Sequence, residues 1–110
     1  MTRESDPLLE RMRTRVRQGH FRLSQHATQQ MDSRGRTLEA VQQTILEGEI
    51  IRHYPDEQPY PECLFLGYPG GPEDPCYVVV ASNDETVIVT VHNYDPAIYG
   101  ADHRTRRRPS

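Results

Sequence analysis

Apolar side chains recur at intervals of four residues near the start of the chain, which places them on one face of a helix. They are Leu8, Leu9, Met12 and Val16. Pro7 suits the first turn of this helix because its missing N–H needs no partner there, and Gly19 ends the helix. Ser5 or Asp6 is the expected N-cap.

Two more helices are expected, over residues 25–33 and 38–47, after a short extended link at residues 20–23. Their expected N-caps and terminal glycines are Ser24 and Gly35 for the first, and Thr37 and Gly48 for the second. The first helix has a thin apolar stripe of Ala27 and Met31. The second has a fuller inward face, which consists of Leu38, Val41, Ile45 and Leu46.

Beyond Gly48 the pattern changes to the alternation and β-branched composition typical of strands. Four strands are expected, over residues 49–54, 63–68, 76–82 and 87–92. The links between the last three are short and rich in turn-forming residues, which favours antiparallel hairpins. The apolar run at residues 78–80 is typical of a central strand. We therefore predict an α+β fold, with N-terminal helices packed on one face of a four-stranded antiparallel sheet.

The two cysteines, Cys63 and Cys76, fall on adjacent strands of this arrangement. At ~3.3 Å per residue they lie roughly 16 Å out of register, which is too far for a disulfide. Two reduced thiols are expected, as in a reducing compartment.

Charge is distributed unevenly along the chain. All 13 basic residues are arginine, and the formal net charge is −3. Residues 1–36 carry +4, residues 37–103 carry −11 with Arg52 as their only arginine, and residues 104–110 carry +4. The 110 residues have the length of one small domain, which we place at residues 1–103, followed by a basic disordered tail. No membrane span or signal peptide pattern is found, so a cytoplasmic location is expected.

The sequence shows no pattern for a bound cofactor. The five histidines lack the spacing of a helical zinc site, and neither cysteine belongs to a C-x-x-C pair. Gly70 and Gly71 are not followed by a helix or a lysine, so they do not form a phosphate-binding loop. We expect neither a metal nor a nucleotide cofactor.

A polar stripe on the expected second helix has side chains suited to proton transfer and anion binding. His26, Gln30 and Arg34 follow one another at intervals of four, and Ser24 lies at the helix entrance. A histidine moves protons near neutral pH, and an arginine on the same face holds an anion. A purely structural role is the alternative, because a surface helix needs a polar face and a cation in its last turn interacts favourably with the helix dipole.

A second polar cluster lies at strand ends. Its members are Arg52, His53 and Tyr54 on the first strand, and Thr90, His92, Asn93 and Tyr94 on and after the last. Because side chains alternate along a strand, Arg52 and Tyr54 share one face and His53 takes the other. The alternative for Tyr54 and His92 is that of half-buried rings with a solvated tip.

Several of these positions resemble a known family, the domain of unknown function family 4258, over residues 20–107. The most specific element is Ser-x-His-Ala followed by Met-x-x-Arg-Gly, whose positions are occupied by Ser24, His26, Met31, Arg34 and Gly35. The family commonly ends its last strand with Thr-x-Tyr and continues to a Trp. This chain has Thr90-Val-His92, then Tyr94, with Tyr99 near the position of the Trp. Any role of the strand-end tyrosine therefore passes to His92 or Tyr94.

The resemblance implies both a fold and an activity. The family is regarded as related to the RelE-like toxins, which pack helices on an antiparallel sheet and cleave RNA without a metal. Some members resemble the toxins of pairs whose antitoxin is a small zinc-finger protein of the MqsA type. The implied function is that of an endoribonuclease, in which a ribose 2′-OH attacks the adjacent phosphate.

For this reaction we predict two groups of site residues. The catalytic candidates are His26, Arg34, His92 and Tyr94, and the RNA-contacting candidates are Ser24, Gln30, Arg52 and Tyr54. The last strand is expected to face the polar stripe of the second helix. The competing hypothesis is a non-catalytic binding or regulatory module, in which Ser24 caps the helix, His26 hydrogen-bonds a backbone carbonyl, and Arg34 pairs with an acid such as Asp56 or Glu57.

Overall fold

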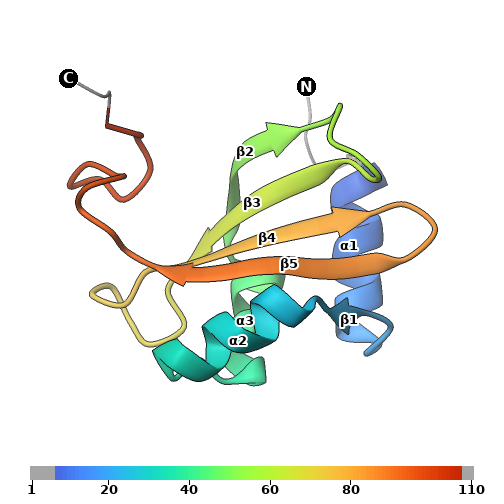
Figure 1. The fold of residues 1–110 in the computed structure, drawn as a ribbon, viewed down its shortest axis with the longest axis horizontal. Coiled ribbons are helices and arrows are strands. Elements are labelled where there is room, and N and C mark those ends of the chain that lie inside the picture. Colours follow the sequence, from blue (N-terminus) through green and yellow to red (C-terminus); the bar gives the residue numbers. More distant parts are fainter. Residues whose placement is uncertain (1–6, 108–110) are drawn as a thin grey trace.

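The structure, a computed structural model, describes residues 7–107. The expected N-caps Ser5 and Asp6 lie outside this range. The helices are α1 (Pro7–Arg17), α2 (Gln25–Arg34) and α3 (Leu38–Glu47), and the strands are β1 (Arg22–Leu23), β2 (Glu49–Tyr54), β3 (Glu62–Gly67), β4 (Cys76–Ser82) and β5 (Thr86–Asn93). They form an α+β fold with one sheet in the order β1-β5-β4-β3-β2 (Figure 1). The expected central position of β4 is confirmed.

The sheet is mixed, which corrects the expectation of four antiparallel strands. Residues 20–23, expected to be a link, contain the short strand β1, which pairs parallel with β5 through Arg22↔Val87 and Leu23↔Ile88. Two residues are too few to show an alternating pattern. The pairing arises because the outer edge of β5 would otherwise leave its backbone groups without partners.

The rest of this edge is closed by α2, which runs alongside β5 (Figure 1). Ser24, the confirmed N-cap of α2, donates its N–H to the carbonyl of Ile88 (2.9 Å) and its hydroxyl to the carbonyl of Val89 (2.8 Å). One and a half turns later, Gln30 Oε1 accepts the N–H of Val91 at 2.7 Å. Side chains of α2 thus take the place of a neighbouring strand.

Replacing Gln30 with alanine is expected to lower the free energy of unfolding by about 1–2 kcal/mol, because the half-buried N–H of Val91 loses its acceptor. Urea unfolding measures the change. Gln29→Ala, at an exposed position of the same helix, is the matched control and should change stability by less than ~0.5 kcal/mol. Equal effects of the two substitutions would show that α2 does not close the edge.

The three helices share one core on one face of the sheet. Its buried members are Met12, Val16, Ala27, Val41, Ile45, Cys63, Phe65, Cys76, Val78, Val80, Ile88 and Val91. The bounds of α3 and its Thr37 cap are confirmed, but Leu38 is 38% exposed rather than inward, because it lies in the first turn of the helix. Cys63 is opposite Val80 and Cys76 is opposite Gly67, so the two thiols occupy different levels of the β3–β4 pair.

The opposite face of the sheet holds a second apolar cluster, built on Leu64, Leu66, Tyr77 and Tyr99. Two irregularities in register determine which polar residues join it. In β2 the pairing passes from Ile50 to Arg52, and in β5 it passes from Ile88 to Thr90. Arg52 therefore lies opposite Leu64, and His92 lies opposite Tyr77.

Residues 98–107 fold back on themselves as a C-terminal hairpin. Gly100 N–H donates to the carbonyl of Thr105 (2.8 Å), Arg107 N–H donates to that of Ile98 (2.7 Å), and Tyr99 bridges to Arg106. Backbone pairing and the bridge to Tyr99 thus hold residues 104–107, which the sequence analysis assigns to the tail. Residues 108–110 lie outside the described range.

Candidate functional site

Three rings form an aromatic stack on the face of the sheet opposite the helices. Tyr77 stacks on Tyr99 with 4.4 Å between ring centroids and on His92 with 4.9 Å, and both pairs are nearly parallel. The two tyrosine side chains are buried, whereas His92 is half-buried. His92 Nε2 lies 3.4 Å from the Tyr99 hydroxyl, and His92 is the member of the stack that is partly exposed to solvent.

Two arginines from distant parts of the chain lie near this imidazole. Burial, and to a lesser extent the positive charges of Arg34 and Arg106, together lower the pKa of His92 to about 4, against a smaller opposing effect of Asp95. Arg34 belongs to the last turn of α2, and Arg106 belongs to the C-terminal hairpin. His92 is therefore a neutral imidazole at pH 7, with two cations near it.

Many arginines elsewhere already have partners. Arg22, Arg36 and Arg104 form salt bridges with Glu85, Asp74 and Glu49. Arg11, Arg13 and Arg15 of α1 donate to carbonyl and hydroxyl oxygens of the β4–β5 turn or of the end of α3. Three arginines thus have their charge paired with an acid, and three others have donors bound to neutral oxygens.

Three arginines lie around the stack, and we call Arg34, Arg52 and Arg106 the arginine cluster. Within residues 7–107, none of the three forms a salt bridge. Arg52, the lone arginine of the acidic middle, donates instead to the carbonyls of Ile51 (2.7 Å) and Arg104 (3.1 Å). A carbonyl leaves the positive charge of a guanidinium uncompensated, so this surface attracts anions.

Tyr99 connects the candidates on β2 with those on β5. Two strands separate β2 from β5, which puts them about 14 Å apart at the usual strand spacing. Burial raises the pKa of the Tyr99 hydroxyl, with Arg106, Tyr54 and Arg52 as further influences, so all three lie near it. The structure thus brings Arg52, Tyr54 and His92 together around one hydroxyl.

The candidates on α2 have different surroundings. Arg34 lies near His92, as expected for a stripe that faces the last strand, and its described hydrogen bond goes to the Ser33 hydroxyl at 3.4 Å. His26 is exposed and, eight residues earlier, lies about 12 Å from Arg34 along the helix axis. Ser24 and Gln30 use their side chains to close the edge of β5. The RNA-binding roles of these two residues stay predictions.

The contacts of the competing structural hypothesis are formed only in part. Ser24 caps α2 as that hypothesis expects. Among the described residues, however, Arg34 makes no salt bridge with Asp56 or Glu57, and the His26 side chain donates to no backbone carbonyl. The other strand-end candidate, Tyr94, directs its hydroxyl to the carbonyls of Tyr99 (3.2 Å) and Gly100 (3.1 Å) and so holds the hairpin.

Sequence reasoning missed three members of the site. Tyr77 was included in an apolar strand, Tyr99 was noted only as standing near a family Trp, and Arg106 was assigned to the tail. The alternation of β4 could have indicated Tyr77, because it places this ring on the face opposite Val78. No local pattern indicates Arg106, since its position depends on a hairpin that packs against a distant strand.

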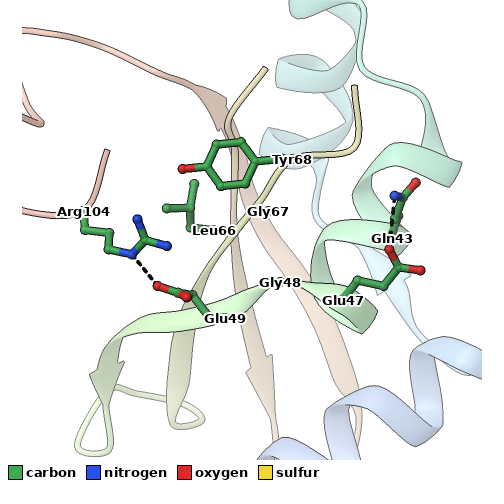
Figure 2. Close-up of a pocket in the computed structure, with 8 residues that line it drawn as sticks. All are labelled: Gln43, Glu47, Gly48, Glu49, Leu66, Gly67, Tyr68 and Arg104. Atoms are coloured by element: carbon green, nitrogen blue, oxygen red, sulfur yellow. Dashed lines mark hydrogen bonds and ion pairs between the residues drawn. The ribbon is translucent and has the colours of Figure 1, made fainter. Parts of the chain in front are cut away.

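A separate cavity of about 330 Å³ lies beside the C-terminal hairpin (Figure 2). It is lined by Gln43, Glu47, Gly48, Glu49, Leu66, Gly67, Tyr68 and Arg104. Its polar groups are bound to one another, because Arg104 Nε donates to Glu49 (2.5 Å) and Gln43 donates to Glu47 (3.2 Å). We therefore do not place the anion site here.

Two features are absent from residues 7–107. None of the three helices combines the length and the apolar character needed to cross a membrane. No three histidine, cysteine or acidic side chains within that range are grouped as potential metal ligands.

The fold and the site define a small α+β protein with arginines around a largely buried aromatic stack on one sheet face. The chain belongs to the family of the domain of unknown function DUF4258, whose family model matches residues 23–92. The match includes Arg34, Arg52 and His92 but ends before Tyr99 and Arg106. No match was found among curated proteins or solved structures.

Proposed function

We propose that this protein is a metal-independent endoribonuclease whose site is the polar edge of the aromatic stack. The observation that supports this most is the pair of arginines, Arg34 and Arg106, beside a neutral, half-buried imidazole, with Arg52 near the adjacent Tyr99 hydroxyl; none of the three forms a salt bridge within the described residues. Arginine clusters bind phosphates through bidentate hydrogen bonds, and a neutral imidazole accepts a proton. The chemistry of RNA cleavage requires both.

In this mechanism the phosphodiester lies between Arg34 and Arg106. His92 Nε2 accepts the proton of the ribose 2′-OH as its oxygen attacks the adjacent phosphorus. The bond from phosphorus to the 5′-oxygen breaks, and the leaving oxygen takes a proton from a solvent water, because the Tyr99 hydroxyl is buried. The hydroxide formed takes the proton held by the His92 imidazolium, which restores the neutral imidazole. The products are a 2′,3′-cyclic phosphate and a 5′-hydroxyl. The guanidinium groups stabilise the charge that develops on the phosphate.

Bound substrate would also change the basicity of His92. The positive charges of Arg34 and Arg106 contribute to its low pKa, and a phosphodiester between them compensates those charges. The pKa of His92 therefore rises toward its ordinary value when RNA binds. A base that is weak in the free protein becomes a better base in the complex.

The resemblance to RelE-like toxins supports the same activity and extends the proposal to biology. A toxin of this kind acts in the cytoplasm and is held inactive by a partner, here a small zinc-finger antitoxin of the MqsA type. An RNA-cleaving toxin arrests the growth of its host on expression.

The direct test is cleavage of end-labelled single-stranded RNA in the presence of EDTA. Arg34→Ala and Arg106→Ala are each expected to lower the rate by about 10- to 100-fold, because each removes one phosphate ligand. Arg17→Ala removes an exposed arginine of α1 and should leave the rate unchanged. Equal rates for all four proteins, or no cleavage by the wild type, would contradict the proposal.

A non-catalytic RNA-binding module is the second candidate, and one observation favours it. A pKa of about 4 leaves His92 far from the neutral range in which a general base is most effective. This candidate predicts that the wild type binds RNA and that the arginine variants bind it more weakly, without any cleavage product.

A further inference from the structure

Arg106 lies at the site because the turn of the C-terminal hairpin brings the second arm back alongside Tyr99. Asp102 and His103 occupy the turn, and His103 has a left-handed backbone with φ 67°. Asp102 Oδ1 accepts the N–H groups of Arg104 (3.0 Å) and Thr105 (2.9 Å), and Oδ2 accepts the Thr105 hydroxyl (2.6 Å). These bonds lower the pKa of Asp102 to about 2, so the carboxylate is charged at every pH of interest.

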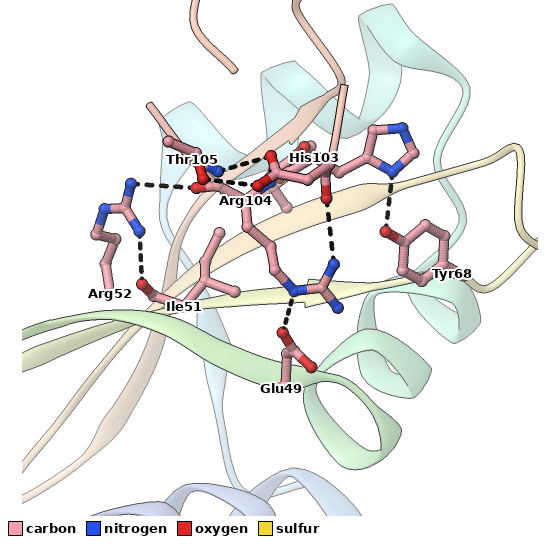
Figure 3. A network of polar contacts seen from close by, with 9 residues as sticks. Glu49, Ile51, Arg52, Tyr68, His103, Arg104 and Thr105 are labelled. Atoms are coloured by element: carbon pink, nitrogen blue, oxygen red, sulfur yellow. Dashed lines mark hydrogen bonds and ion pairs between the residues drawn. The ribbon is translucent and has the colours of Figure 1, made fainter. Parts of the chain in front are cut away.

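The two arms of the hairpin are held to the sheet differently. The first arm is anchored by the buried ring of Tyr99, which stacks on Tyr77. The second arm, shown in part in Figure 3, has exposed contacts, including the Arg104–Glu49 salt bridge and the Arg52 bond to the carbonyl of Arg104. Exposed pairs of this kind contribute little on their own. The Asp102 bonds of the turn are therefore one local restraint on where the second arm, and with it Arg106, lies. The others are the backbone pairs of Gly100 with Thr105 and of Arg107 with Ile98, and the bond from the Tyr77 hydroxyl to the carbonyl of His103 (2.6 Å).

We propose that Asp102 is a positioning residue of the site, because its turn sets the register that pairs Arg106 with Tyr99 and places its guanidinium beside His92. This inference rests on the proposed function for its effect on RNA. Its structural part, the approach of Arg106 to His92, does not.

A comparison of Asp102→Ala with Asp102→Asn separates the effect of the turn hydrogen bonds on the position of Arg106 from the effect of the Asp102 charge. Both remove the same negative charge, which alone would strengthen RNA binding. Asparagine keeps an oxygen that can accept the two backbone N–H groups, whereas alanine keeps none. We expect Asp102→Ala to reduce the salt slope of RNA binding by about 0.7, the contribution of one phosphate contact on a single strand. At 0.15 M salt this corresponds to about fourfold weaker binding, and Asp102→Asn should stay within about twofold of the wild type.

The NMR titration of His92 provides a readout that does not depend on RNA. Loss of Arg106 from its side should move the pKa of His92 upward from about 4 in Asp102→Ala and leave it unchanged in Asp102→Asn. Asp84→Ala, an exposed acid in the β4–β5 turn, should change neither readout. Identical His92 titrations in Asp102→Ala and the wild type overturn the inference. An upward shift without any RNA binding by the wild type upholds it and instead contradicts the proposed function.

Discussion

His92→Gln is expected to reduce RNA cleavage by at least ~100-fold, which is the contribution typical of a general base. Glutamine keeps a polar group near the Tyr99 hydroxyl but does not take up a proton at neutral pH. RNA affinity should fall less than threefold, since the arginine cluster is intact. Single-turnover rates and filter binding measure the two quantities. His20→Ala, at an exposed position outside the site, is the control.

The pH dependence of cleavage distinguishes His92 from other bases. Cleavage requires the neutral imidazole, so the rate falls as pH drops through the pKa of His92. In kcat/KM, which reports the free protein, this decline is expected at about pH 4. In kcat, which reports the complex, it moves to higher pH because bound phosphate compensates Arg34 and Arg106. A decline at the same pH in both profiles, or its persistence in His92→Gln, contradicts the assignment.

Arg36→Ala is expected to lower the free energy of unfolding by about 3 kcal/mol. The Arg36 side chain is only 8% exposed, and it donates to both carboxylate oxygens of Asp74 (2.8 and 2.9 Å). It also donates to Asn93 Oδ1 (2.9 Å) and to the carbonyl of Pro75 (3.0 Å). One guanidinium thus ties the α2–α3 link to the β3–β4 loop and the end of β5.

Arg34→Ala, two residues away, is the matched control for this prediction. Arg34 is exposed and lacks a salt bridge to any described acid, so its loss should change stability by less than ~0.5 kcal/mol while it weakens RNA binding. Urea unfolding of the two variants measures the difference. Similar losses of stability would mean that Arg34 is structural as well.

Regular elements were predictable because their signals are local. Caps and periodicity gave the bounds of α3 and β4, and the alternation of side chains placed Arg52 and Tyr54 together, as the register confirms. The pairing of β1 with β5 was not predictable, because it depends on what lies beside an edge rather than on residues 22–23 themselves. The same reason applies to Tyr99, which stacks on Tyr77, and to Arg106, which pairs with Tyr99.

Composition could not identify the important arginines. The chain has 13 arginines and no lysine, and the distribution of partners distinguishes Arg34 from Arg36. In the folded chain, the carboxylates and carbonyls that pair with an arginine come from distant segments. Partner assignment is a tertiary property, so a count along the chain does not contain it.

The unpaired positions Ile51 in β2 and Val89 in β5 make the site depend on the number of residues as well as on their identity. Each extra residue reverses which face every later residue of its strand occupies. Deleting one residue before Arg52 or before His92 would turn that side chain toward the helices, whereas a substitution at Ile51 or Val89 would not. An alignment of relatives that omits either extra residue would therefore match residues of the helix-covered face of the sheet with residues of the site.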